Sequence, residues 1–172
     1  MVCYHVGMAE DRMWYVYLDE PMRELVDLTY KLIEREEHSD EKLECYDFMV
    51  FPMAKAYEGF LKKYLLDMGL ISEVAFRSKH FRLGRSLNPK LPREWRDTRW
   101  LYDDLEKRCD ETSDGRTTAA VIWEAWKRGR NEVFHYFPST QYKSSFEDAK
   151  QRVELIRRAM QSALECKYRL GV

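Results

Sequence analysis

Arg130, Asn131 and His135 are the residues whose types and spacing best suit chemistry on a phosphate. They stand in one short segment, Arg-Asn-Glu-Val-Phe-His, near the end of a strongly helical stretch. A histidine can carry a proton near neutral pH, and an arginine can bind two oxygens of one phosphate. RNA cleavage without a metal needs both a proton carrier and positive charge at the phosphate, and this segment offers both.

The helix expected over residues 116–137 separates these side chains from its core-facing side. At about 100° per residue, one apolar stripe faces the core, and it consists of Ala119, Ile122, Trp126, Val133 and Phe137. Asn131 and His135 lie one above the other on roughly the opposite side. Arg130 falls at the edge of the stripe, where its stem can follow apolar surface while its charged head emerges.

Three further apolar residues of this helix, Val121, Phe134 and Tyr136, fall outside the core stripe. A helix that is apolar on more than one side is usually buried on more than one side. In a chain of this size we expect a partner subunit to cover the second side, and a two-fold dimer is the commonest arrangement. Two copies of His135 would then supply a base for the 2′-hydroxyl and an acid for the leaving 5′-oxygen.

The same residues also have a structural interpretation. A histidine near the end of a helix can simply favour the helix dipole. Arg130 can pair with an acid of another helix, and Asn131 can be an ordinary surface residue.

The composition indicates a globular chain of one domain, residues 1–172, with a sizeable core. Apolar residues make up 45% and charged residues 34%, and the formal net charge is −1. That charge argues against a generally basic nucleic-acid surface but allows a local basic patch. No apolar run approaches the roughly 18 residues that cross a membrane, and no secretory signal is evident. We therefore expect a cytoplasmic protein with no membrane contact.

The cysteines and histidines are scattered along the chain. Cys3, Cys45, Cys109 and Cys166 form no CxxC pair, which favours a reduced, cytoplasmic protein. Among the histidines, only Cys3-x-His5 approaches the spacing of metal ligands. The sequence therefore predicts neither a metal site nor a cofactor.

Hydrophobic periodicity predicts an all-α fold, a compact bundle of about five helices. The expected helices span residues 20–38, 44–68, 95–108, 116–137 and 145–168. The first carries Leu25, Leu28 and Leu32 at helical spacing, and the last carries a core stripe of Ala149, Val153, Ile156, Met160 and Ala163. Residues 12–18 fit a strand or an extension of the first helix.

Local signals mark where the helices should begin, bend and end. Pro52 should kink the second helix or mark its true start, and Gly69 should cap its end. Asp114 is placed to cap the fourth helix, and Pro138 to stop it. Ser144-x-x-Glu147 has the pattern of a capping box for the fifth.

Residues 71–96 form a basic, loop-rich segment between the second and third helices. Its acids are Glu73 and Glu94, whereas its cations are Arg77, Lys79, Arg82, Arg85, Lys90, Arg93 and Arg96. Such a patch can hold a phosphate backbone, with Lys79, Arg82 and Arg85 as candidate substrate-binding residues. A solvated surface loop is an equally good interpretation.

Arg-Asn-x-x-x-His on the penultimate long helix of a small helical protein resembles the signature of the HEPN superfamily. The stretches "KRGRNEVFHYFP" and "FPMAKAYEGFLKKYLLDMGLI" resemble the HEPN domain of RNase LS-type (RnlA-like) toxins. The resemblance covers roughly residues 44–168. It implies a helical bundle that dimerises through its motif-bearing helices, and a metal-independent endoribonuclease of a toxin–antitoxin or defence system.

The resemblance also implies roles for single residues. His135 would be the acid–base residue, Arg130 would bind the scissile phosphate, and Asn131 would orient His135 or the phosphate. The RNA products would carry 2′,3′-cyclic phosphate and 5′-hydroxyl ends, and an antitoxin protein is a possible partner. Glu58 is a weaker candidate that can pair with Arg130 from the second helix, although a solvated glutamate is the simpler interpretation.

Two other functions remain open from the sequence. One is a non-catalytic module of HEPN shape that binds RNA or a protein, and the other is a helical scaffold without RNA affinity. The sequence motifs of P-loop NTPases, dinucleotide-binding folds, serine hydrolases and zinc proteases are absent.

Overall fold

The computed structural model describes residues 13–98, 100–109, 115–136, 138 and 143–171. The all-α prediction is confirmed for these residues, which form helices and no strand. Three long helices, α2 (Glu20–Glu37), α3 (Asp47–Asp67) and α9 (Phe146–Arg169), form the frame. A fourth helical stretch consists of α7 (Thr118–Ala125), the π-helical segment η3 (Trp126–Asn131) and α8 (Glu132–Phe134).

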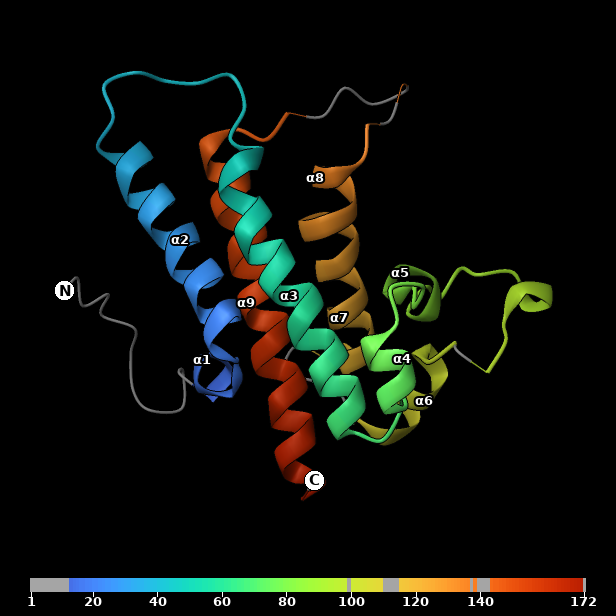
Figure 1. The fold of residues 1–172 in the computed structure, drawn as a ribbon. Helices are drawn as coiled ribbons and strands as arrows, with labels where there is room; N and C mark the ends of the chain where they lie inside the picture. The colour runs from blue at the N-terminus through green and yellow to red at the C-terminus, as the bar shows by residue number, and fades with distance from the viewer. Residues whose placement is uncertain (1–12, 99, 110–114, 137, 139–142, 172) are drawn as a thin grey trace.

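The long helices lie roughly side by side, with α3 between α2 and the α7–α8 stretch in the view of Figure 1 and α9 packed against both α3 and α7. The short helices α4 (Glu73–Arg77), α5 (Leu83–Ser86) and α6 (Tyr102–Arg108) gather beside the lower part of α3 and α7. A 3₁₀ turn, η2, covers Arg93–Trp95. This arrangement brings the basic segment between α3 and α6 next to the α7–α8 stretch.

The central position of α3 follows from its sequence, which is apolar on more than one side. Its rings form a buried stack in which Phe60 lies 6.3 Å from Tyr57 and 5.9 Å from Tyr64, between ring centroids. The helix begins at Asp47 rather than residue 44 and runs through Pro52, so Pro52 does not mark its start. Gly69 follows the helix with φ +65°, as predicted for a C-terminal cap.

The core stripe predicted for the last helix is confirmed, because Ala149, Val153, Ile156, Met160 and Ala163 are all buried. Its capping box is shifted by one residue from the predicted one. Ser145 accepts from the Asp148 backbone N–H, and the Asp148 carboxylate accepts from Ser145. Ser144 is instead buried and donates to Asp47 at the start of α3, so a tertiary contact displaces it from the cap.

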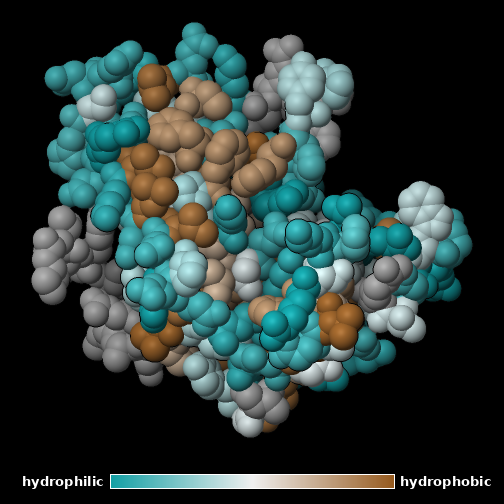
Figure 2. Space-filling model, in the orientation of Figure 1, coloured by the Kyte–Doolittle hydropathy of each residue, from teal (hydrophilic) through white to brown (hydrophobic). Residues whose placement is uncertain are grey.

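The stripe predicted on the first helix is only partly directed at the core. Leu28 is 44% exposed, whereas Val26 and Thr29 are fully buried on α2. Helical spacing alone allows either the leucine side of this helix or the adjacent side with Val26 and Thr29 to face the core. The packing of α2 on α3 determines which side is buried. Figure 2 shows the result, with hydrophobic side chains gathered at the surface over α2 and α3.

Several predicted boundaries were wrong. The helix expected at 95–108 begins at Tyr102, and residues 13–17 of the undecided N-terminal stretch form a short helix, α1 (Met13–Tyr17). Thr117 caps α7 by accepting from the Ala120 N–H, whereas the predicted cap Asp114 lies outside the described residues. The helical stretch ends at Phe134, before Pro138, and Phe137 also lies outside the described residues.

Cys109 and Cys166 are joined by a disulfide across 57 residues, with their Cα atoms 5.4 Å apart. The prediction of four reduced cysteines is therefore wrong for this pair, since α6 and α9 bring together residues that the sequence keeps apart. Cys45 is free, and Cys3 lies outside the described residues. In the part of the chain that the structure describes, no helix is long and apolar enough to cross a membrane.

Candidate functional site

The helix that carries the candidate residues changes its hydrogen-bonding pattern where they begin. The Glu132 N–H donates to the carbonyl of Lys127, five residues earlier, instead of the carbonyl of Arg128. The Arg128 carbonyl accepts instead from the guanidinium of Arg152 on α9. A side chain that inserts into the helical ladder in this way widens the turn, and such π-helical turns are frequent at functional sites.

Arg152 is a residue that the sequence interpretation missed. Its side chain is 4% exposed, and its Nη1 lies 3.2 Å from a carboxylate oxygen of Glu132. A buried guanidinium needs such partners, because an unpaired buried charge is strongly unfavourable. One signal was present in the sequence, since Arg152 stands three residues after Ala149 and one before Val153, within the core stripe of α9.

Gly129 allows the π-helical segment to approach α9 closely. A Cβ atom at this position would lie 2.7 Å from Cγ1 and 2.8 Å from Cδ1 of Ile156. Real Cβ atoms essentially never come so close, so the contact depends on the absence of a side chain. Arg152 and Gly129 together fix the helix on α9 next to Arg130.

Arg130 lies in a partly aromatic environment at the surface. Its guanidinium carbon is 5.1 Å from the ring centroids of both Trp126 and Phe134, within the range of cation–π attraction. Its Nη2 lies 3.6 Å from Oε2 of Glu58 on α3. The pairing of Arg130 with Glu58 that the sequence offered as a hypothesis is therefore present, and the role of Glu58 toward a substrate stays a prediction.

The guanidinium of Arg130 also contacts the two other candidate residues. Its Nη1 lies 3.2 Å from Nε2 of His135 and 3.3 Å from Oδ1 of Asn131. A guanidinium has only donors, so Nε2 is the accepting atom of this contact. The structure thus brings Arg130, Asn131 and His135 together, with Arg130 one-quarter exposed and His135 exposed.

The surroundings of the helix differ in one respect from the prediction. Phe134 and Tyr136 are exposed outside the core stripe, as expected, but Val121 is buried. The reason is that α9 packs against α7 and extends the buried side of this helix beyond a single stripe. Phe134 contacts Phe51 of α3 with a centroid distance of 4.7 Å, so the exposed rings continue onto α3.

Trp126 lies between the Arg130 site and the basic segment. A Cβ atom at Gly84 of α5 would lie 2.7 Å from its Nε1, so α5 packs directly on the indole. Beneath it, Tyr57 donates to the Ile122 carbonyl at 2.9 Å, and burial raises the pKa of the Tyr57 phenol well above its usual value. The phenol is thus a fixed structural donor under the site.

The candidate substrate-binding cations lie on and just before α5. Lys79 and Arg82 are exposed, and Arg82 immediately precedes the helix. Arg85 donates to the Trp95 carbonyl at 2.8 Å and lies 3.8 Å from Asp97. Arg85 therefore also braces the loop after α5, whereas Lys79 and Arg82 face solvent close to the element that covers Trp126.

Chemically, the cluster offers one imidazole nitrogen with a lone pair, one guanidinium and one amide at a solvent-accessible surface. The described residues include no group of three or more histidine, cysteine, aspartate or glutamate side chains able to hold a metal ion. Comparisons of the chain with models of protein families, with characterised proteins and with solved structures found no match. The resemblance to HEPN ribonucleases therefore rests on the residues quoted above.

Proposed function

We propose that the protein is a metal-independent endoribonuclease that cuts RNA by attack of the 2′-hydroxyl. The observation that carries the proposal is the contact of Arg130 with both Asn131 and His135 at an accessible surface. An imidazole beside a cation is the pair of groups that this reaction requires. The products would carry 2′,3′-cyclic phosphate and 5′-hydroxyl ends.

In this mechanism, Arg130 changes partners when RNA binds. A phosphate oxygen takes the donors that Arg130 now directs at His135 and Glu58, because a doubly hydrogen-bonded arginine–phosphate pair is stronger than these contacts. Nε2 of His135 then accepts the proton of the 2′-hydroxyl. Asn131 holds the guanidinium in place through its Oδ1.

A second copy of the chain would complete the site. Phe51, Phe134 and Tyr136 are 41–75% exposed next to Arg130 and His135, and apolar rings of this size favour an interface. A two-fold dimer across this surface places a second His135 opposite the first. The second imidazole would then protonate the leaving 5′-oxygen, a step for which one histidine alone is insufficient.

The proposal extends to a biological role. An enzyme of this kind would act as a toxin or antiviral defence effector in the cytoplasm, with an antitoxin protein as a possible partner. A non-catalytic RNA- or protein-binding module is the alternative, and the pairing of Arg130 with Glu58 in the free protein favours it.

The decisive experiment is RNA cleavage in excess EDTA. We expect end-labelled RNA to give cyclic-phosphate ends with the wild-type protein, and at least about a hundredfold slower cleavage with His135→Ala. His38→Ala is a matched control, because His38 is also exposed and also follows the last residue of a helix. Equal cleavage by wild-type and His135→Ala protein would exclude the assigned site, and binding without cleavage would favour the alternative.

A further inference from the structure

A small pocket lies in the basic segment, between α5 and the loops on either side of it. Its volume is about 50 Å³. One water needs roughly 10–15 Å³ of such space, so the pocket has room for about four water-sized groups. That room suits the oxygens of one phosphate and is too small for a nucleobase. The residues that line the pocket are His80, Arg82, Arg85, Ser86, Asp97 and Trp100, and the three candidate catalytic residues are not among them.

The pocket lies in a segment with an excess of positive charge. Residues 77–98 contain the seven lysines and arginines of the basic segment against two carboxylates. Two of these cations are paired, Arg77 with Glu73 and Arg85 with Asp97. The other five have no carboxylate partner in the described part of the chain. The local field therefore attracts an anion.

Two arginines supply the charge at the pocket itself. Arg82 is exposed, and its guanidinium makes no ion pair or hydrogen bond with the described residues. Nη2 of Arg85 donates to the Trp95 carbonyl at 2.8 Å and lies 3.8 Å from Asp97, so the loop holds this side chain in place. The pair with Asp97 is long and exposed, hence weak, and a phosphate that takes two arginine donors binds more strongly.

Ser86 is the second sign of a ligand. It is 3% exposed on α5 and lines the pocket. Its hydroxyl makes no hydrogen bond with the described residues, yet the oxygen is not fully enclosed, so it reaches solvent through the pocket. Polar side-chain atoms of buried residues usually have a partner. A phosphate oxygen in the pocket would accept from this hydroxyl.

The rings beside the pocket favour RNA over other ligands that carry a phosphate. Trp95, whose carbonyl accepts from Arg85, is 60% exposed and offers a stacking surface to a base next to the bound phosphate. Trp100 lines the pocket, and the guanidinium carbon of Arg96 lies 3.9 Å from its ring centroid. Cations combined with accessible rings are typical of sites for single-stranded nucleic acid.

We propose that this pocket binds one phosphate group of an RNA chain, separately from the phosphate that is cut. Arg82 and Arg85 pair with the phosphate oxygens, and the Ser86 hydroxyl donates to one of them. The choice of RNA rests on the proposed function. Because α5 packs on Trp126, whose ring centroid lies 5.1 Å from the guanidinium of Arg130, one RNA chain can reach both sites.

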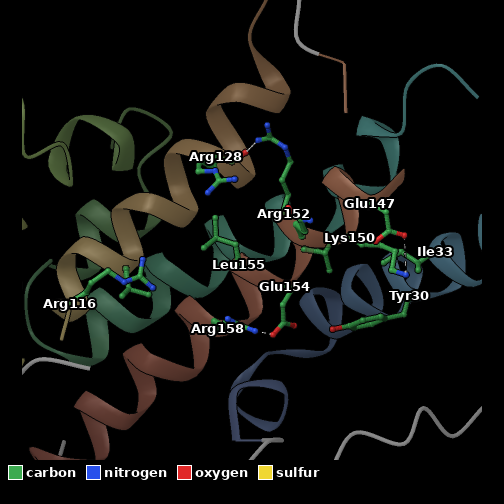
Figure 3. A pocket seen from close by; sticks show the side chains of 13 residues that line it. Tyr30, Ile33, Arg116, Arg128, Glu147, Lys150, Arg152, Glu154, Leu155 and Arg158 are labelled. Atoms are coloured by element: carbon green, nitrogen blue, oxygen red, sulfur yellow. Dashed lines mark hydrogen bonds and ion pairs between the residues drawn. The ribbon is translucent and has the colours of Figure 1, made fainter. Parts of the chain in front are cut away.

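A larger hollow of about 560 Å³ along α9 has no comparable features. Figure 3 shows Arg158 beside Glu154 in this hollow, and the buried Arg152 lies 3.2 Å from Glu132. Val121 also lines it but belongs to the core. Its charges are thus already paired, whereas those of the small pocket are largely available.

The first test measures binding of fluorescent 2′-O-methyl oligouridine, which keeps the phosphates but cannot be cut by attack of a 2′-hydroxyl. Ser86→Ala should weaken binding about tenfold, because a hydrogen bond to a charged phosphate is lost. Its thermal stability should stay unchanged, since the hydroxyl has no partner in the protein. Ser162→Ala is the matched control and should bind normally, because Ser162 is also buried with an unpaired hydroxyl but lies outside the pocket.

A second pair of variants separates the pocket from general attraction. Arg82→Gln should weaken binding at least about tenfold and make it less dependent on salt. Arg93→Gln should weaken it less than about threefold, because Arg93 is an exposed cation of the same segment that does not line the pocket. Equal losses for these two variants, or equal binding by wild-type and Ser86→Ala protein, would overturn the proposal.

The source of the phosphate is tested with and without a 5′-phosphate on the oligouridine. An effect of Ser86→Ala on the 5′-phosphorylated chain alone assigns the terminal phosphate to the pocket, and an equal effect on both chains assigns a backbone phosphate. Binding of inorganic phosphate with no affinity for either chain would refute a site for RNA. Binding that depends on Ser86 in a protein that cuts no RNA would refute the ribonuclease proposal and retain the pocket.

Discussion

The guanidinium of Arg130 shows how one side chain can serve both structure and chemistry. Its faces lie near the rings of Trp126 and Phe134, while its nitrogens reach Glu58, Asn131 and His135. An arginine suits this position because its planar head can stack and donate in several directions at once. Lysine carries the same charge but has neither the plane nor the fork of donors.

Arg130→Lys should therefore lower the rate of RNA cleavage by roughly a hundredfold while leaving the protein folded. Arg128→Lys is the matched control and should cleave at the normal rate, because Arg128 is exposed and its side chain pairs with Glu124. Single-turnover cleavage of end-labelled RNA measures both. A normal rate for Arg130→Lys would show that charge alone matters at this position.

Gly129 is the second residue whose identity the packing fixes. Gly129→Ala should destabilise the protein by about 2 kcal/mol, because the new methyl group meets Ile156. This loss exceeds the gain of about 1 kcal/mol that alanine brings to a helix. Urea unfolding gives the free energy.

A double-mutant cycle tests the cause. Ile156→Ala removes both Cγ1 and Cδ1, which lie 2.7 and 2.8 Å from the position that a methyl group on residue 129 would take. The double variant should then be more stable than the sum of the single effects predicts, by about 1 kcal/mol. Strict additivity would mean that Gly129 is required for another reason.

At the scale of elements, the π-helical segment depends on α9. The Arg152 guanidinium donates to the Arg128 carbonyl. The Glu132 N–H therefore donates to the carbonyl of Lys127, one residue before Arg128. The segment also carries Arg130 and Asn131, so a residue of another helix determines how these side chains are presented. Arg152 thus positions the site without belonging to it.

Arg152→Met keeps most of the side-chain volume but removes the buried donors. We expect a loss of about 2 kcal/mol in the free energy of unfolding, because the Arg128 carbonyl and Glu132 lose a partner. The exposed Arg77→Met should change stability by less than about 0.5 kcal/mol. Loss of RNA cleavage in a folded Arg152→Met protein would show that the π-helical turn itself is needed.

At the scale of the whole molecule, the Cys109–Cys166 disulfide ties the end of α6 to α9. Closing a loop of 57 residues removes freedom from the unfolded chain. Reduction by dithiothreitol should lower the free energy of unfolding by about 3 kcal/mol. Urea titrations with and without reductant measure the difference.

Two variants make this test specific. Cys109→Ser with Cys166→Ser should be equally stable with and without dithiothreitol, whereas Cys45→Ser should respond like the wild type because Cys45 is free. A wild-type protein whose stability is unchanged by reductant would show that the bond does not form in solution.

The proposed dimer is also a property of the whole molecule. Phe134→Asp places a charge among Phe51 and Tyr136 on the exposed aromatic surface, and should convert a dimer to a monomer in sedimentation velocity runs. Val74→Asp is the control, since Val74 is an equally apolar and 80% exposed residue on α4. A wild-type monomer at all concentrations would contradict the shared site.

The sequence by itself determined the long helices and most of their buried faces, but it missed the short helices α4 and α5, which lie in the segment predicted to be loop-rich. Periodicity is a local property, so the stripes on α9 and on α7 through Val133 could be predicted, as could the cap at Gly69. The four-residue spacing of Asn131 and His135 was also a local signal. The contact of Arg130 with His135 was not, because it spans five residues and forms where the helix ends and the backbone of His135 is extended.

Only the tertiary structure decided the features that depend on distant segments. Arg152 reaches a carbonyl 24 residues earlier, Ser144 leaves its expected cap for Asp47, and Cys109 meets Cys166. Val121 is buried and Leu28 exposed for the same reason, since the side of a helix that is covered depends on which neighbour packs there. The local sequence pattern determines which sides of a helix are apolar enough to be buried. Tertiary packing determines which of those sides is buried.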